Sequence, residues 1–382
     1  AASPGKNRQS NNLPAVADNQ PGLLRPSKTA MTFQSYNEAN HAITRFIERG
    51  EGEFDQLAFA LHQLQAKHVP AIAALCQNRG IDSATLDQID QIPAIPTTAF
   101  RDMAITSIPE KNRTSHFESS GTTATQPSVH WHHEVSLSLY ETSLIRPFQH
   151  HVLNNHVWSG HILALTPPPA EAPHSSLAHM ASQVLDDGTI YAGKWQNDGW
   201  SIDSQTCESA CAKAIHENAP LLLFGPAFSF LNWLDSTEGS YELPNESRIM
   251  ETGGYKGRSR ELPKNEFHGL LSERLGVPES HIVCEYGMCE LSSQAYDRKA
   301  GTNKERAFRF PDWARPIIIN TETGAPCEAA ETGLLRIIDL ANVFSSIAIQ
   351  TQDLARSIED GFELLGRAQA AELRGCSLNL LQ

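Results

Sequence analysis

A loop rich in hydroxyl groups is the segment of this sequence best suited to chemistry. It runs from Glu118 to Ala124 and surrounds Gly121 with four hydroxyl side chains, those of Ser119, Ser120, Thr122 and Thr123. Because Gly121 has no Cβ, the N–H groups and hydroxyls of such a loop can approach one anion closely. We therefore predict that the loop binds a polyphosphate. An ordinary turn is the alternative, because Ser, Thr and Gly also cluster in turns.

An aromatic ring and a carboxylate form a second candidate site. The apolar run from His281 to Cys284 predicts a buried strand, and the residues Tyr-Gly-Met-Cys-Glu follow it at 286–290. An aromatic face can stack on a purine base, and a carboxylate can hold Mg²⁺ beside phosphate oxygens. We predict that Tyr286 and Gly287 bind a nucleotide and that Glu290 binds the metal. The alternatives are a core tyrosine and a carboxylate that caps a following helix.

Two residues near the end of the sequence suit a ribose. Asp353 follows a predicted strand, Ser346 to Gln350, and Arg367 lies fourteen residues later. A carboxylate can accept hydrogen bonds from both ribose hydroxyls, and an arginine can bridge ribose and phosphate. Asp353 and Arg367 are therefore predicted to contact a nucleotide.

These segments together resemble the adenylate-forming superfamily, which includes acyl-CoA synthetases and the adenylation domains of peptide synthetases. The phosphate loop of that superfamily is similar to residues 119–128, and its Tyr-Gly-x-Thr-Glu motif is similar to residues 286–290. Its ribose aspartate and arginine match Asp353 and Arg367. The resemblance implies ATP and Mg²⁺ as cofactors. It also implies an α/β fold in which stacked mixed β-sheets are flanked by helices, as in the large domain of these enzymes.

A closer resemblance is to the LuxE-type acyl-protein synthetases, over about residues 31–382. Four short segments carry it: Leu165-Thr166-Pro167, Ser175-Ser176-Leu177, Thr252 to Arg258, and Arg374 to Leu378. Members of this family activate a carboxylic acid with ATP and then carry the acyl group on a cysteine near the C-terminus. The resemblance implies catalytic roles for Cys376, Glu290 and Arg367. It further implies a fatty acid substrate and an acyl-accepting partner, either a reductase or an acyltransferase.

A pair of glycines lies inside one of the matching segments. Gly253 and Gly254 indicate backbone that packs flat against a ligand, which in the superfamily is the adenine. A plain Gly-Gly turn is the alternative. Lys256 and Arg258 add positive charge that can face phosphates, an acyl carboxylate or solvent.

The sequence departs from the superfamily at several positions. Ala124, Ser128 and Cys289 stand where glycine, lysine and threonine are usual. Loss of the lysine weakens the contacts with pyrophosphate unless another cation replaces it. A complete superfamily enzyme continues into a lid domain of about a hundred residues that carries a catalytic lysine. We expect that lid to be absent, as in the LuxE type.

Cys376 is the candidate acyl carrier. A thiolate attacks an acyl adenylate readily, and a thioester keeps the acyl group activated. Arg374 is close enough in sequence to lower the pKa of the thiol, and a position near the terminus suits a mobile arm. A buried, inert cysteine is the alternative. We predict that inert state for three other cysteines: Cys76, Cys207 and Cys211.

A histidine-rich strand invites a metal hypothesis. Within the segment 130–133, His130 and His132 share one face of a strand. No acidic or thiol partner lies at a zinc-like spacing, so we favour histidines of the acyl pocket or of the surface. The candidate walls of that pocket are Trp131, Phe228 and Phe230.

The composition excludes several classes of function. A net charge of −14 argues against nucleic-acid binding. The sequence has no apolar run long enough for a membrane span and no signal peptide at its N-terminus. Seven cysteines without a CxxC pair suit a reducing cytoplasm. Residues 1–30 indicate a disordered tail or extension, and residues 31–382 indicate the acyl-protein synthetase domain.

Alternating helices and strands must position the candidate residues. Short apolar runs predict strands at 162–165, 221–224 and 334–340, and apolar periodicity predicts helices at 54–79, 206–218 and 265–275. Gly276 is expected to end the last helix. The pattern is typical of an α/β fold.

Three functions fit these observations. The first is an ATP-dependent acyl-protein synthetase that transfers the acyl group from acyl-AMP to Cys376. The second is an adenylating ligase that passes the acyl group to CoA or a carrier protein, with Cys376 structural. The third is a degenerate nucleotide-binding scaffold. The identity of the acid cannot be inferred from the sequence.

Overall fold

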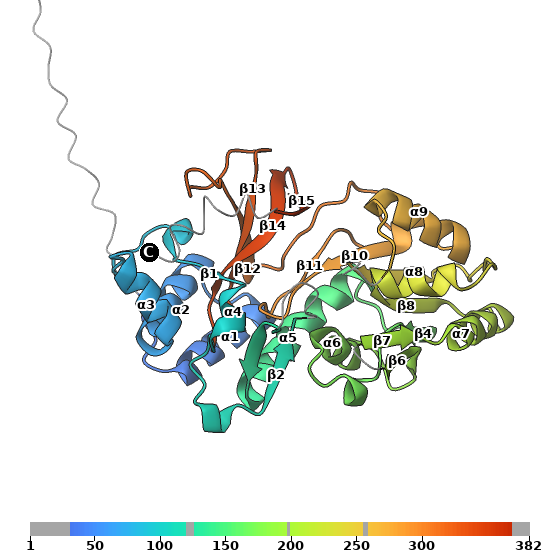
Figure 1. Ribbon diagram of the computed structural model, residues 1–382, viewed down its shortest axis with the longest axis horizontal. Helices are drawn as coiled ribbons and strands as arrows, with labels where there is room; N and C mark the ends of the chain where they lie inside the picture. Colours follow the sequence, from blue (N-terminus) through green and yellow to red (C-terminus); the bar gives the residue numbers. More distant parts are fainter. Residues whose placement is uncertain (1–30, 120–125, 197–198, 255–258, 369–382) are drawn as a thin grey trace, which may run out of the picture. The chain divides into compact units, whose positions relative to one another are not determined.

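The computed structural model describes residues 31–119, 126–196, 199–254 and 259–368. Residues 1–30 lie outside this part, so the predicted boundary between a tail and a domain at residue 31 stays a prediction. The elements are α-helices and β-strands that alternate along most of the chain (Figure 1). No helix in the described ranges is long and apolar enough to cross a membrane.

A six-stranded sheet forms one half of the fold. Its order is β11-β10-β9-β8-β4-β5, and every neighbouring pair is parallel except β10 with β11. The strands are β4 (His161–Ala164), β5 (Ile190–Tyr191), β8 (Leu221–Pro226), β9 (Arg248–Thr252), β10 (Ile282–Tyr286) and β11 (Ala295–Tyr296). All residues of β8 are buried. Such apolar runs form strands because parallel sheets are covered on both faces.

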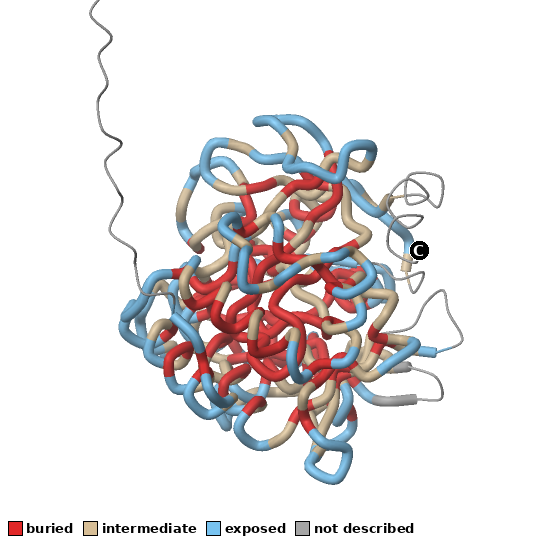
Figure 2. Tube along the Cα trace, turned by 90° about the vertical axis from the view of Figure 1, so that its left-hand side faces the viewer, coloured by how far each residue is buried: buried red, intermediate tan, exposed pale blue. Residues whose placement is uncertain are grey.

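Helices cover both faces of this sheet. One face packs against α7 (Ser204–Glu217), α8 (Ala227–Asp235) and α9 (Lys264–Leu275). The other face packs against α5 (Glu134–His151) and α6 (Ser176–Val184). Figure 2 shows the buried segments gathered in the interior and the exposed segments around them. The sheet therefore has no exposed face.

A second, mixed sheet lies beside the N-terminal helices (Figure 1). Its order is β1-β14-β13-β12, and β15 also pairs with β14. The strands are β1 (Ile95–Pro96), β12 (Ala314–Ile319), β13 (Thr332–Asp339), β14 (Ala348–Ile358) and β15 (Gly361–Arg367). The helices α1 (Tyr36–Arg49), α2 (Phe54–His68), α3 (Pro70–Asn78) and α4 (Ala99–Asp102) share apolar cores with this sheet.

Two hairpins and four short 3₁₀ turns complete the described elements. The hairpins are β2 (Ser115–Glu118) with β3 (Val129–His132), and β6 (Gly193–Gln196) with β7 (Gly199–Ile202). The 3₁₀ turns are Ile89–Gln91, Glu110–Asn112, Pro169–Glu171 and Glu279–His281. The first hairpin matters most for function, because the hydroxyl-rich loop connects β2 to β3.

The predicted α/β fold with mixed sheets flanked by helices is confirmed. The predicted helix 265–275 is α9, and Gly276 ends it in the left-handed conformation with φ of 66°. The prediction of one helix from 54 to 79 is wrong. Pro70 has no N–H and disfavours helical backbone at Val69, so the chain forms α2 and α3 instead.

Candidate active site

The carboxyl ends of β9 and β10 bring two predicted site segments together. The strands are parallel neighbours, and Thr252 at the end of β9 pairs with Glu285 near the end of β10. Gly253 and Gly254 therefore leave the sheet beside Tyr286 and Gly287. Ligands of open α/β sheets bind at such carboxyl ends. Gly254 has a φ of 102°, which side-chain-bearing residues rarely adopt.

Tyr286 is fixed by contacts with the second sheet. Its hydroxyl donates a 2.7 Å hydrogen bond to Oδ2 of Asp353. The edges of three rings pack around it, those of Phe308, Phe310 and Phe362. Burial and the negative charge of Asp353 raise the pKa of Tyr286 well above its usual value. The phenol therefore stays protonated and acts as the donor.

Asp353 and Arg367 face each other across β14 and β15. They are register partners, and Nε of Arg367 lies 3.3 Å from Oδ1 of Asp353. The side chain of Asp353 is 15% exposed, whereas that of Arg367 is 72% exposed. The prediction that Asp353 follows a strand is wrong, because β14 continues to Ile358 and includes it. Tyr286, Asp353 and Arg367 nonetheless form one contiguous group.

The β2–β3 hairpin closes the base of the hydroxyl-rich loop. The N–H of Ser119 donates to the carbonyl of Ser128 at 3.0 Å, and the N–H of Ser128 donates to Oγ of Ser119 at 2.9 Å. Ser120, Gly121, Thr122, Thr123 and Ala124 lie outside the described residues. Two hydrogen bonds of about 3 Å therefore join the two residues, Ser119 and Ser128, that flank the loop.

Glu290 is buried beside the base of that loop. It is 5% exposed, and Sγ of Cys289 lies 3.2 Å from its Oε2. Burial raises the pKa of Glu290, while hydrogen bonds from Cys289, its own backbone and Ser128 and the charge of Arg367 oppose that rise. The alternative role as a helix cap is wrong, because residues 291–294 form no helix.

Ser128 occupies the position of the superfamily's lysine. It is 5% exposed, and its hydroxyl donates to the carbonyl of Thr97 at 3.3 Å. Arg367 places a positive charge in this region instead. It pairs with Asp353, and its charge lowers the pKa of Glu290 against the effect of burial.

The histidines of β3 connect the hairpin to residues 286–290. Nδ1 of His130 lies 2.8 Å from the carbonyl of Cys289, to which it donates. His130 and His132 are both buried, with ring centroids 4.4 Å apart. The described residues contain no group of three or more His, Cys, Asp or Glu that could hold a metal.

The three candidate pocket walls do not come together. Trp131 is a hairpin residue, and its ring lies under the guanidinium of Arg113, with 5.3 Å between the guanidinium carbon and the ring centroid. Phe228 stacks on Trp200 of β7, and Phe230 belongs to the core on the α8 face of the six-stranded sheet. They therefore line no common pocket.

The predicted inert cysteines are buried. This holds for Cys76, Cys207 and Cys211. Burial raises the pKa of Cys211 to about 12 and that of Cys207 further. Cys376 and Arg374 lie outside the described residues, as do Lys256 and Arg258.

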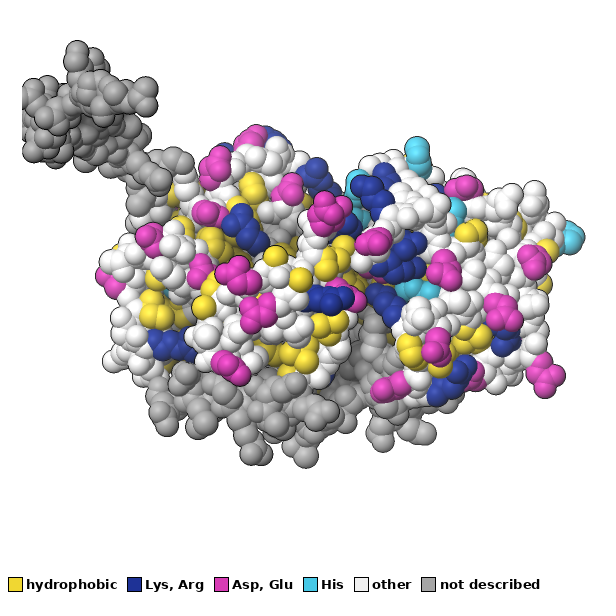
Figure 3. Space-filling view, turned by 90° about the horizontal axis from the view of Figure 1, so that it is seen from above, with side chains coloured by type: hydrophobic (Ala, Val, Ile, Leu, Met, Phe, Trp, Pro, Cys, Tyr) yellow, Lys and Arg dark blue, Asp and Glu magenta, His cyan; other side chains and the backbone are white. Residues whose placement is uncertain are grey.

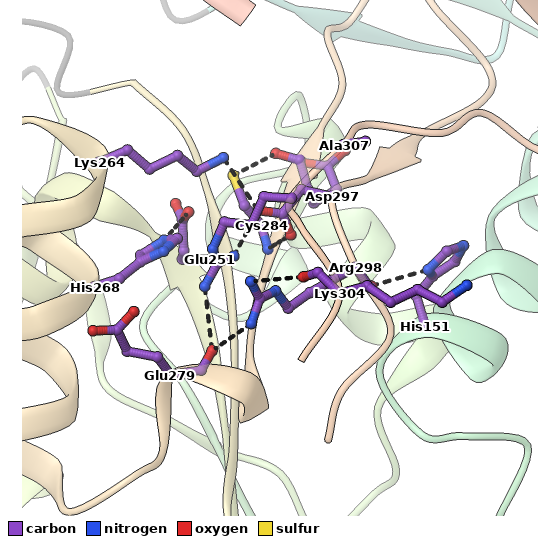
Figure 4. A network of polar contacts seen from close by, with 12 residues as sticks. His151, Glu251, Lys264, His268, Glu279, Cys284, Asp297, Arg298, Lys304 and Ala307 are labelled. Atoms are coloured by element: carbon purple, nitrogen blue, oxygen red, sulfur yellow. Dashed lines mark hydrogen bonds and ion pairs between the residues drawn. The ribbon is translucent and has the colours of Figure 1, made fainter. Parts of the chain in front are cut away.

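A network of charged side chains that the sequence analysis did not predict supports the ends of β9 and β10 (Figure 4). Nε2 of His268 lies 2.9 Å from Oε1 of Glu251. Asp297 accepts a 2.8 Å hydrogen bond from the N–H of Cys284. Two cations pair with the Asp297 carboxylate: Arg306 at 2.6 Å and Lys264 at 3.4 Å.

The network fixes the two strands that carry the candidate nucleotide site. Glu251 and Cys284 are register partners. Glu251 lies two residues before Gly253, and Cys284 lies two residues before Tyr286. Burial alone would raise the pKa of Glu251, but His268 and Lys264 hold it below its usual value. These partners are far apart in sequence, so no local pattern could have found them.

Positive side chains also gather on the molecular surface. Figure 3 shows Lys and Arg side chains near the middle of the face that it views. Asp and Glu side chains lie among them, in keeping with the net charge of −14 of the whole chain.

Known structures share this fold. An open form of 2-hydroxyisobutyryl-CoA ligase, in complex with 2-HIB-AMP and CoA, is 11% identical with a TM-score of 0.56, over 82% of this chain and 75% of that chain. The same ligase in its thioesterification state is 10% identical with a TM-score of 0.58, over 82% and 67%. A comparison with curated proteins found no significant match.

The family of the chain follows from its sequence and fold together. The sequence matches the family described as acyl-protein synthetase, LuxE, over residues 56–382. This range contains every element that forms the candidate site, from β2 to β15. The chain therefore belongs to the LuxE acyl-protein synthetase family, whose members are AMP-forming acid ligases.

Proposed function

We propose that this protein activates a carboxylic acid with ATP and transfers the acyl group to Cys376 as a thioester. A fatty acid is the class that the family resemblance implies. The observation that carries the proposal is the contact of Tyr286 with Asp353, beside Arg367. It joins an aromatic ring, a carboxylate and a guanidinium at the carboxyl edge of a parallel sheet, as a purine nucleotide requires.

Adenylation is an in-line displacement. A carboxylate oxygen of the acid attacks the α-phosphorus of ATP, the bond to the β-phosphate oxygen breaks, and pyrophosphate leaves. The hydroxyl-rich loop above Ser119 and Ser128 would donate to the phosphates, where fixed donors stabilise the developing charge. Gly253 and Gly254 would pack against the adenine, and Asp353 would accept from the ribose hydroxyls.

Glu290 fits the requirements of a magnesium ligand. Its carboxylate is a hard oxygen donor next to the Ser128 hydroxyl at the base of the phosphate loop. A nearby dication would lower the raised pKa of this buried acid and so stabilise its ionised form. Bound Mg²⁺ would supply charge neutralisation on the phosphate oxygens.

The second step forms the thioester. The Cys376 thiolate attacks the acyl carbonyl, the carbonyl–phosphate bond breaks, and AMP leaves with the electron pair. A reductase or acyltransferase partner would then receive the acyl group. We also propose a cytoplasmic location, since all cysteines in the described ranges are free thiols.

The intact mass of the protein after incubation with MgATP and carboxylic acids tests both steps. We expect an acyl adduct on the Cys376 peptide that hydroxylamine removes. Cys376→Ser should abolish the adduct and keep ATP–pyrophosphate exchange, whereas the control Cys327→Ser should keep both.

Each alternative gives a different result. Exchange without any adduct, restored by CoA or a carrier thiol, would identify a ligase with an external acceptor. The absence of exchange with every acid would identify a degenerate scaffold. Glu290→Gln should reduce exchange and increase the Mg²⁺ concentration required, and Glu305→Gln on the surface should do neither.

A further inference from the structure

A group of buried polar side chains lies beneath the candidate active site and has no role in the steps above. We name it the polar compartment: His132, Tyr140, Glu285, Gln294 and Tyr296. These residues come from β3, α5, β10, the segment before β11, and β11. His132, Tyr140 and Tyr296 are each at most 2% exposed, and Glu285 and Gln294 are each 5% exposed. Buried polar groups in such number need an explanation.

Several contacts make the compartment continuous. Glu285 and Tyr296 are register partners on β10 and β11, so their side chains share one face of the sheet. The ring centroids of His132 and Tyr140 are 5.9 Å apart. The charge of Glu285 adds to burial in raising the pKa of Tyr140 and of Tyr296. These residues therefore lie close to one another in the interior.

Gly287 connects the compartment to the active site. A Cβ at Gly287 would lie 2.3 Å from Oε1 of Glu285 and 3.3 Å from Cγ of Gln294. Gly287 is the second residue of the segment 286–290, between the groups proposed to bind base and magnesium. An acid whose carboxylate reaches the α-phosphate at this point would extend its first carbons toward Glu285 and Gln294.

The compartment contains hydrogen-bonding atoms that no described residue satisfies. They are Nδ1 and Nε2 of His132, Oε1 of Gln294 and the hydroxyl of Tyr296. Burial lowers the pKa of His132 well below its usual value, so the ring is neutral and offers one donor and one acceptor. Among these unsatisfied atoms, acceptors outnumber donors.

We propose that the compartment selects acids that carry a hydrogen-bond donor, a hydroxyl or amino group, close to the carboxylate. The inference rests on the proposed function and names its substrate class. A plain hydrocarbon chain would leave these atoms unsatisfied in the interior, which is unfavourable. Sites built to bind a substrate hydroxyl or amine reject the analogue that lacks it.

The test measures ATP–pyrophosphate exchange by the full chain with three matched acids: octanoic acid, 3-hydroxyoctanoic acid and 3-aminooctanoic acid. We expect kcat/KM for a substituted acid to exceed that for octanoic acid by about tenfold or more. Comparing the increase in kcat/KM for 3-hydroxyoctanoic acid with that for 3-aminooctanoic acid would show whether a hydroxyl or an amino donor fits better.

Tyr296→Phe removes one oxygen and keeps the ring that stacks on His151 at a centroid distance of 5.1 Å. This variant and His132→Leu should each reduce the preference for the substituted acid over octanoic acid by severalfold. Tyr241→Phe, at a half-buried tyrosine beside Trp233, is the matched control and should keep the preference. A thermal melt of each variant checks that it is folded.

The outcomes separate this inference from the proposed function. Exchange with no acid at all would refute the proposed function and the inference with it. Equal rates with all three acids, or a preference for octanoic acid, would leave the function standing and show that the compartment holds only internal water. A preference that survives both Tyr296→Phe and His132→Leu would also overturn the inference.

Discussion

The hydroxyl of Tyr286 and the carboxylate of Asp353 are 2.7 Å apart and join the end of β10 to β14 of the other sheet. Tyr286→Phe removes this donor and frees the ring and the carboxylate to move independently. A hydrogen bond to a charged group contributes about 1.5 kcal/mol or more, so KM for ATP should rise about tenfold while kcat changes less. Exchange kinetics over a range of ATP concentrations measure this. Tyr241→Phe is the control, and an unchanged KM would contradict the proposed nucleotide site.

Gly253 offers a test that separates binding from folding. A Cβ at this position would meet no atom of the described residues within 4 Å. Gly253→Ala should therefore leave the melting temperature unchanged. If the adenine packs against this backbone, the added methyl should raise KM for ATP about fivefold or more. Gly239→Ala is the matched control, since its Cβ is also unobstructed and lies away from the site. Equal ATP affinity in both variants would place the adenine elsewhere.

The pair of Glu251 and His268 should contribute more to stability than a similar pair on the surface. Both side chains are at most 2% exposed and 2.9 Å apart. Glu251→Gln removes a buried charge whose partners stay, which should lower the free energy of unfolding by about 3 kcal/mol. Glu217→Gln breaks a 2.8 Å pair with His161 that is largely exposed, and should cost less than about 1 kcal/mol. Denaturant unfolding compares the two; equal losses would mean that the network is not structural.

Acid should destabilise the protein between pH 6.5 and 4. Burial lowers the pKa of His62 and of His130 from 6.5 to about 4, and that of His132 well below 6.5. The unfolded chain therefore binds more protons in this window, so stability is present above pH 6.5 and is lost as the pH falls. The loss is on the order of 3 kcal/mol for each imidazole that titrates in the unfolded state alone.

Two buried carboxyls, those of Asp339 and Glu290, act in the opposite direction, because burial raises the pKa of each. Burial raises the pKa of Asp339 to about 6, so its protonation below pH 6 favours the folded state. Burial also lowers the pKa of His151 to about 4, so the shifted imidazoles outnumber the shifted carboxyls and the net change should still be a loss. Calorimetric melts at several pH values measure it, and His130→Gln should flatten the dependence whereas His41→Gln, on the exposed face of α1, should not. A melting temperature that rises on acidification would show that the two carboxyls dominate.

The pattern of apolar residues along the sequence predicted those helices and strands whose apolar spacing is the same from end to end. The strands β4 and β8 and the helix α9 were of this kind, because both ends carry a break that the sequence displays. The predicted strand 346–350 ends too early, because the second half of β14 carries polar residues such as Gln352 and Asp353 that interrupt the apolar run.

The arrangement of the site needed long-range contacts that a sequence does not display. Tyr286 and Asp353 were each identified from their surroundings, but the hydrogen bond between them depends on how two sheets meet. The same is true of His132 and Tyr296, which belong to strands more than a hundred residues apart and share one volume only in the fold.

The position of Arg367 sets a length scale for the acyl transfer. Cys376 lies nine positions along the chain from Arg367, which is on the rim of the proposed ribose site. Such a tether spans at most about 30 Å when extended. If Cys376 carries the acyl group, the adenylate meets its thiol at an effective concentration on the order of millimolar. A free thiol such as CoA would have to reach comparable concentrations to compete, so short tethering alone would direct the product toward an acyl-protein.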